Sequence, residues 1–184
     1  MKFQETSLKG NYLIDLEKHK DERGFLNRTF CQKTLEPLLK EKNIRQINHT
    51  LTKKEGVVRG LHFQYAPYAE IKIVSCIKGK VWDVVVDLRK ESPTFLHYYA
   101  VILSENNLKS FFIPEGFAHG FQTLTPDCEM LYFHTEDYNP DCEGALNATD
   151  PLLSIKWPQF ITERSKRDSS HPMLNKNFLG IDVA

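Results

Sequence analysis

The segment Arg59-Gly60-Leu61-His62-Phe63-Gln64 holds a candidate for acid–base chemistry. Histidine exchanges protons near neutral pH, and an arginine lies three residues before it. On a regular strand Arg59 and His62 would face opposite sides, so both enter one cavity only if the strand bulges or bends at Gly60. A single histidine is more often a hydrogen-bonded structural residue than a catalyst. The same caution applies to His19, His49, His97, His134 and His171.

A second segment, Pro114-Glu115-Gly116-Phe117-Ala118-His119, matches the PxGxxH pattern of the second half of the cupin motif. In metal-binding cupins this histidine joins an HxH pair and a glutamate from the first half. Here the first half offers only His62-Phe63-Gln64 and lacks the second histidine. Because open catalytic sites usually need three protein ligands, we expect a cupin barrel with no metal.

The segment Val81 to Asp87 alternates in a way typical of a strand, with Asp83 and Asp87 on one face. The simpler interpretation is a half-buried strand whose acids face water or a neighbouring strand. A catalytic role for either acid is the weaker alternative.

The elements that must position these residues are mostly short strands. Turn signals recur about every 8–12 residues, which favours an all-β sandwich or barrel over alternating βαβ units. The predicted strands are 72–76, 81–87, 98–103, 110–113, 121–124 and 129–134, with helices near 33–42 and 162–168. No linker or repeat divides the chain, so we expect one domain over residues 1–184.

Composition excludes several functions. Lys plus Arg and Asp plus Glu both number 24, so the formal net charge is zero, which disfavours nucleic acid and membrane surfaces as partners. No stretch approaches about 18 apolar residues, and residues 1–10 lack a signal-peptide core, so we expect a cytoplasmic protein. The four cysteines form no CxxC pair, which argues against a zinc site or a disulfide framework.

An ordered series of motifs, spread over nearly the whole chain, resembles the nucleotide-sugar 4-keto-6-deoxyhexose epimerases, typified by dTDP-4-dehydrorhamnose 3,5-epimerase. The motifs are Asp21-Glu22-Arg23-Gly24-Phe25, Gln46-Ile47-Asn48-His49, Val58 to Gln64, Val84 to Arg89, Glu91 to Phe95, Ile113 to Phe121, Leu131-Tyr132, Tyr138-Asn139-Pro140, Asp150-Pro151, Ile155 to Pro158 and Arg167-Asp168. The resemblance implies a cupin jelly roll with a few short peripheral helices, a homodimer, a nucleoside-diphosphate sugar as substrate, and no cofactor.

The resemblance also assigns the catalytic roles. A C4 ketone acidifies the protons on C3 and C5, so epimerisation needs a base on one face, an acid on the other and positive charge near the enolate oxygen. By resemblance, His62 is the base and Asp168 its partner. Tyr132 is the acid, Lys72 lies beside the C4 oxygen, and His119 lines the same pocket.

Substrate binding is likewise assigned by resemblance. Arg23, Arg59 and Arg167 match positions that hold the diphosphate, for which guanidinium groups are suited. Gln46, Asn48 and Tyr138 match positions that border the nucleotide or the sugar.

Three departures from the family pattern leave the substrate open. Arg28 replaces a glutamate that accepts from the thymine ring, and Arg28 would suit cytosine better unless it points to solvent. Ile71, in Glu70-Ile71-Lys72, replaces a small residue and either crowds the pocket or faces the core. Phe133-His134 stands where a lysine is common, and the sequence offers no account of it.

We therefore expect a cofactor-independent 3,5-epimerase of dTDP-4-dehydro-6-deoxyglucose. The alternatives are a 5-epimerase of a CDP-4-keto-3,6-dideoxyhexose, and a 3-only or 5-only epimerase of another sugar nucleotide. A different class of alternative is a non-catalytic cupin that only binds a sugar nucleotide.

Overall fold

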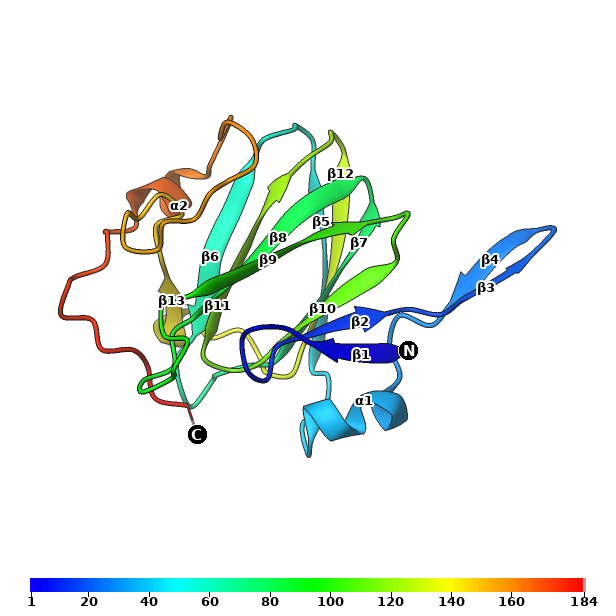
Figure 1. Ribbon diagram of the computed structural model, residues 1–184, viewed down its shortest axis with the longest axis horizontal. Coiled ribbons are helices and arrows are strands. Elements are labelled where there is room, and N and C mark those ends of the chain that lie inside the picture. Colours follow the sequence, from blue (N-terminus) through cyan, green and yellow to red (C-terminus); the bar gives the residue numbers. More distant parts are fainter. Residues whose placement is uncertain (184) are drawn as a thin grey trace.

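The computed structural model describes residues 1–183, which form two antiparallel sheets packed face to face (Figure 1). The six-stranded sheet has the order β1 (Lys2–Glu5), β2 (Tyr12–Asp15), β10 (Lys109–Ile113), β7 (Lys72–Lys78), β12 (Cys128–His134) and β5 (Gln46–Thr52). The five-stranded sheet has the order β13 (Glu143–Ala145), β6 (Val58–Gln64), β11 (Phe117–Thr123), β8 (Lys80–Asp87) and β9 (Tyr98–Ser104). The all-β jelly-roll prediction is confirmed.

The remaining elements are short and peripheral. Strands β3 (Lys18–Asp21) and β4 (Gly24–Asn27) form a hairpin that projects away from the two sheets (Figure 1). Helix α1 (Gln32–Leu39) packs outside the six-stranded sheet, and helix α2 (Lys166–Ser170) lies beside β6. A 3-10 turn, η1 (Pro140–Cys142), precedes β13. Among residues 1–183, no helix is long and apolar enough to cross a membrane.

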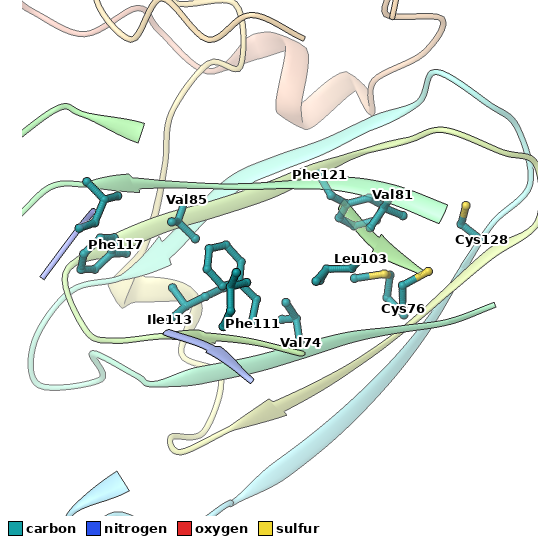
Figure 2. Close-up of a cluster of buried hydrophobic side chains, with 13 residues drawn as sticks. Val74, Cys76, Val81, Val85, Leu103, Phe111, Ile113, Phe117, Phe121 and Cys128 are labelled. Atoms are coloured by element: carbon teal, nitrogen blue, oxygen red, sulfur yellow. The ribbon is translucent and has the colours of Figure 1, made fainter. Parts of the chain in front are cut away.

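The core between the sheets comes from the alternate residues that strand periodicity predicts to face inward. Figure 2 shows Val74 and Phe111 from the six-stranded sheet facing Val85 and Phe121 from the other. At one end of this core the apolar side chains give way to polar ones, and a cavity opens between the sheets.

Strand β8 is more deeply buried than its sequence predicts. Val81 and Val85 point into the core between the sheets, while Val84 and Val86 are covered by the C-terminal segment. The expected half-buried strand is therefore wrong, because a second apolar cluster covers its outer face. That cluster includes Leu153, Trp157, Leu174, Phe178 and Ile181.

The two predicted helices differ from the structure at their ends. Helix α1 ends at Leu39, three residues before the predicted end, and contains Pro37. Helix α2 begins at Lys166, four residues after the predicted start, because the Ser165 hydroxyl caps it by accepting from the backbone N–H of Asp168 at 2.9 Å.

Candidate active site

The cavity between the sheets has a volume of about 440 Å³ and collects most of the predicted site residues. Its walls come from β5, β7 and β12 on one side, from β6 and β11 on the other, and from the segment that leads into α2. Eight predicted residues line it: Asn48, Arg59, His62, Lys72, His119, Tyr132, Arg167 and Asp168.

A bulge in β6 brings Arg59 and His62 to the same cavity. Arg59 pairs with Phe121 and His62 with His119, so two residues of β6 stand opposite the single residue Gly120. The extra residue reverses the alternation of the strand, as Gly60 suggested. Gly60 has φ of +115°, and a Cβ there would lie 2.7 Å from the Gly120 Cα, so glycine is required on both grounds.

His62 of β6 and Asp168, in the first turn of α2, form a hydrogen-bonded pair. His62 Nε2 lies 2.8 Å from Asp168 Oδ1, and the Gly60 backbone N–H donates to Asp168 Oδ2 at 3.3 Å. The Asp168 side chain is 6% exposed. Burial opposes its ionisation, but the hydrogen bond and charge of His62 outweigh burial and hold the pKa of Asp168 below its ordinary value. Asp168 is thus an ionised partner that orients the imidazole.

His119 is held by a second carboxylate. Its Nε2 lies 2.9 Å and 3.0 Å from the two oxygens of Asp83, which is fully buried on the neighbouring strand β8. Burial raises the pKa of Asp83, although His119 acts in the opposite direction. The expectation that Asp83 faces a neighbouring strand is confirmed. Asp87 is also fully buried, where it accepts from Arg89 at 2.8 Å, so neither acid faces water.

Tyr132 lies on the opposite wall from His62. It comes from β12, and its ring contacts the His119 ring edge to face, with centroids 6.2 Å apart. Burial raises the pKa of Tyr132 above its ordinary value, so the phenol stays protonated at neutral pH. A proton acceptor and a proton donor therefore face the cavity from different sheets.

Lys72 lies at the start of β7 with its ammonium turned into the cavity. Its Nζ approaches Glu70 Oε1 at 3.1 Å and the backbone oxygen of His62 at 3.4 Å. Ile71, in contrast, packs outside the six-stranded sheet with Ile14 and Leu35. The hypothesis that Ile71 crowds the pocket is therefore wrong, because its side chain points to the opposite face of the sheet.

Three cationic side chains at the mouth of the cavity suit an anion. The Arg59 Nε donates to the Thr52 hydroxyl at 2.9 Å, and Arg167 forms an ion pair with Glu143. Arg164, which the sequence did not indicate, also lines the cavity and donates to Asn147 at 2.8 Å.

Four predicted binding residues lie outside the cavity of their own chain. Gln46 donates to the backbone of Glu136, and the Tyr138 hydroxyl donates to Glu143. Arg23 is on the projecting hairpin with a side chain that is 84% exposed, and Arg28 follows β4.

Three residues lie close enough to share a metal ion. The ligand atoms of His62, Asp168 and His171 are within 4.8 Å of one another, and in residues 1–183 this is the one such group. Asp168 is engaged by His62 itself, so the residues fit an acid–base pair, and metal independence stays a prediction.

The cavity defines the class of acid–base isomerases, because a proton acceptor and a proton donor face each other across it. Residues 5–176 match the family model described as dTDP-4-dehydrorhamnose 3,5-epimerase, and the chain belongs to that family of isomerases.

Relatives from distant organisms support the assignment. The chain is 45% identical over 161 residues to dTDP-4-dehydrorhamnose 3,5-epimerase of Salmonella typhimurium, covering 86% of this chain and 87% of the relative. It is 38% identical over 179 residues to that of Methanothermobacter thermautotrophicus, covering 96% of each. A crystal structure of the Legionella pneumophila dTDP-6-deoxy-D-glucose-3,5-epimerase in complex with dTDP-4-keto-L-rhamnose superposes with a TM-score of 0.90 at 34% identity, covering 100% of this chain and 99% of that one.

The structure also brings to the site residues that the sequence analysis did not select. Besides Arg164, these include Glu70 and His134. Glu70 contacts Lys72 directly, and His134 contacts Glu70. The alternation of β12 places His134 on the same face as Tyr132, and this signal could have found it.

Proposed function

We propose that this protein inverts C3 and C5 of dTDP-4-dehydro-6-deoxyglucose through enolate intermediates. The observation that carries the proposal is the placement of His62 and Tyr132 on facing walls of one cavity. A base and an acid on opposite sides of a planar enolate are what inversion requires. The similarity to dTDP-4-dehydrorhamnose 3,5-epimerases supplies the substrate class.

Each inversion balances without a redox partner. His62 takes the proton from the carbon next to the ketone, and the C–H electron pair moves onto the C4 oxygen to form an enolate beside Lys72. Tyr132 then protonates the same carbon from the opposite face. Solvent returns a proton to Tyr132 and removes one from His62, so the substrate changes configuration but not composition. The reaction therefore requires no electron-carrying cofactor.

A dTDP-sugar is favoured as the substrate over a CDP-sugar. In the CDP alternative the cytosine preference depended on Arg28, which lies outside the cavity of its own chain. The missing C3 hydroxyl depended on Ile71 narrowing the pocket, and Ile71 packs on the opposite face of the sheet. Relatives described as 3'-monoepimerases are less similar, at 29% identity for a chain from Streptomyces bikiniensis. We further propose that residues 1–184 act as one domain, because the C-terminal segment supplies Asp168 to a cavity formed by the strands.

We infer that the protein acts as a homodimer in which the β3–β4 hairpin reaches the partner. A two-stranded hairpin is barely stable alone, and this one exposes Phe25 (52%) and Leu26 (67%). It also carries Arg23, a cation assigned to the diphosphate, away from the cavity of its own chain. A second copy would bury the apolar residues and receive the arginine. A cytoplasmic location stays a prediction.

Mixing two inactive variants tests the dimer. If Arg23 serves the partner's cavity, then Arg23→Ala and His62→Ala subunits form mixed dimers with one intact site. Random exchange makes half of the dimers mixed, so the recovered activity should approach about a quarter of the wild-type value. Failure to recover activity, although mixed dimers are shown to form, would contradict this role of the hairpin.

Loss of function in single variants tests the chemistry. His62→Ala should abolish uptake of solvent deuterium into a dTDP-4-keto-6-deoxy sugar, because the base is gone. Full activity of this variant would refute the assignment.

A further inference from the structure

A row of polar side chains crosses the cavity face of the six-stranded sheet. Strand pairing places His134 of β12 directly opposite Gln46 of β5 on one side and Lys72 of β7 on the other. Residues directly opposite in an antiparallel sheet share a face, so the row lies on the same face as Tyr132. Of the row, His134 and Lys72 line the cavity, and Gln46 lies outside it. Glu70, two residues before β7 begins, reaches back into this row.

Both oxygens of the Glu70 carboxylate are occupied. Oε1 lies 3.1 Å from Lys72 Nζ, and Oε2 lies 2.8 Å from His134 Nδ1. On its other side, His134 Nε2 lies 3.3 Å from the Asn48 side-chain nitrogen. Nδ1–H therefore donates to Glu70 and Nε2 accepts from the Asn48 amide, which fixes the tautomer of the ring. A continuous chain of hydrogen bonds links Lys72 to Asn48.

Glu70 is a deeply buried charge whose partners both belong to the site. Its side chain is only 6% exposed, and a buried carboxylate is costly unless cations or donors satisfy it. Burial opposes its ionisation, but Lys72 and His134 outweigh burial and hold the pKa of Glu70 below its ordinary value. Both partners line the cavity, so the charge is placed at the reaction site.

The geometry leaves one hydrogen of Lys72 for the substrate. An ammonium group has three N–H donors. One is directed at Glu70, and a second approaches the backbone oxygen of His62 at 3.4 Å. The third is then free in a fixed direction. A donor held in place before the reaction stabilises a developing oxyanion better than one that must reorient.

We propose that Glu70 is a positioning residue for the epimerisation, which holds the Lys72 ammonium toward the C4 oxygen of the substrate while His134 fixes the second oxygen of Glu70. The inference rests on the proposed function, because it takes Lys72 as the group beside the C4 oxygen. It also gives a physical account of the departure at His134.

Glu70→Gln is the variant that tests the proposal, since it removes the charge and retains the size. It should lower kcat about tenfold or more and change KM less than about threefold. The reason is that the enolate charge develops in the transition state and is absent from the bound substrate. The outer face of the same sheet offers a matched control. There Glu129 of β12 contacts His49 of β5 at 2.9 Å and Lys78 of β7 at 3.4 Å. Glu129→Gln should leave both constants unchanged.

Further variants separate the possible failures. Lys72→Met should itself lower kcat, and adding Glu70→Gln to it should cause little further loss. A Glu70→Gln enzyme with wild-type kcat, or a further tenfold loss in the double variant, would overturn the inference and leave the proposed function standing. A wild-type protein that takes up no solvent deuterium would instead overturn the proposed function. If Glu70→Gln does not fold, Glu70→Asp keeps the charge but loses the reach, and the same fall in kcat at constant KM is expected.

Discussion

Replacing Asp168 by asparagine removes the charge behind the proposed base and leaves the shape of the side chain nearly unchanged. In the wild-type protein the carboxylate, whose side chain is 6% exposed, accepts from His62 at 2.8 Å. A hydrogen bond to a charged group contributes about 1.5–3 kcal/mol. This contribution is largest when His62 carries the abstracted proton, so its loss should raise the barrier rather than weaken substrate binding. The expected fall in kcat is about 10- to 150-fold.

The assay for Asp168→Asn measures kcat and KM with a dTDP-4-keto-6-deoxy sugar, together with the rate of deuterium uptake from solvent. Both rates should fall together, because the two depend on the same proton abstraction. Asp87→Asn is a suitable control, because Asp87 is equally buried beside Arg89 but does not line the cavity. Its folded fraction should retain wild-type kcat. An Asp168→Asn enzyme whose kcat stays within about twofold of wild type would refute the role of the pair.

Three further predictions concern other parts of the protein. Tyr132→Phe should retain deuterium exchange by the base but lose inversion, which NMR of the recovered sugar can show; unchanged product would exclude the phenol as the acid. Burial opposes ionisation of Asp87, but its hydrogen bonds to Arg89 and two hydroxyl groups outweigh burial and lower the pKa of Asp87. The ionised carboxylate therefore stabilises the fold above about pH 4, and this stabilisation is lost as the pH falls further. Urea unfolding of Asp87→Asn should therefore show lower stability at pH 7 and a weaker loss of stability in acid, and parallel curves for the two proteins would contradict this. Gly60→Ala should destabilise the fold by about 1–3 kcal/mol, because the added Cβ meets the backbone of β11, and a neutral effect on the melting temperature would argue against the close approach.

Strand periodicity and turn signals predicted an all-β sandwich or barrel, because inward and outward positions alternate in the sequence as they do in the sheets. That this sandwich is a cupin jelly roll was predicted by the resemblance to a known family. The predicted strand 81–87 corresponds to β8, which begins one residue earlier. What periodicity could not predict is how deeply β8 is buried. Its outer face is covered by residues such as Trp157 and Phe178, which lie far along the chain and have no regular pattern.

The candidate site was predicted by resemblance more than by pattern. The structure brings His62, Asp168, Tyr132 and Lys72 to one cavity, although they are up to 106 residues apart. The sequence predicts that Arg59 and His62 can share a cavity only if the strand bulges or bends at Gly60. It does not predict that the bulge is present, because only the pairing with β11 reveals the extra residue.

Other parts of the site depend on contacts that the sequence does not reveal. The position of Arg23 outside its own cavity follows from the direction of the hairpin. The contacts of Glu70 depend on the three-strand register that places His134 opposite Lys72.

Incubation in deuterated buffer with dTDP-4-dehydro-6-deoxyglucose tests the central claim most directly. The wild-type protein should introduce two deuterium atoms, at C3 and at C5, as mass spectrometry and NMR of the sugar can show. His62→Ala should introduce none. Absence of exchange with wild-type protein, or equal exchange with His62→Ala, would contradict the account.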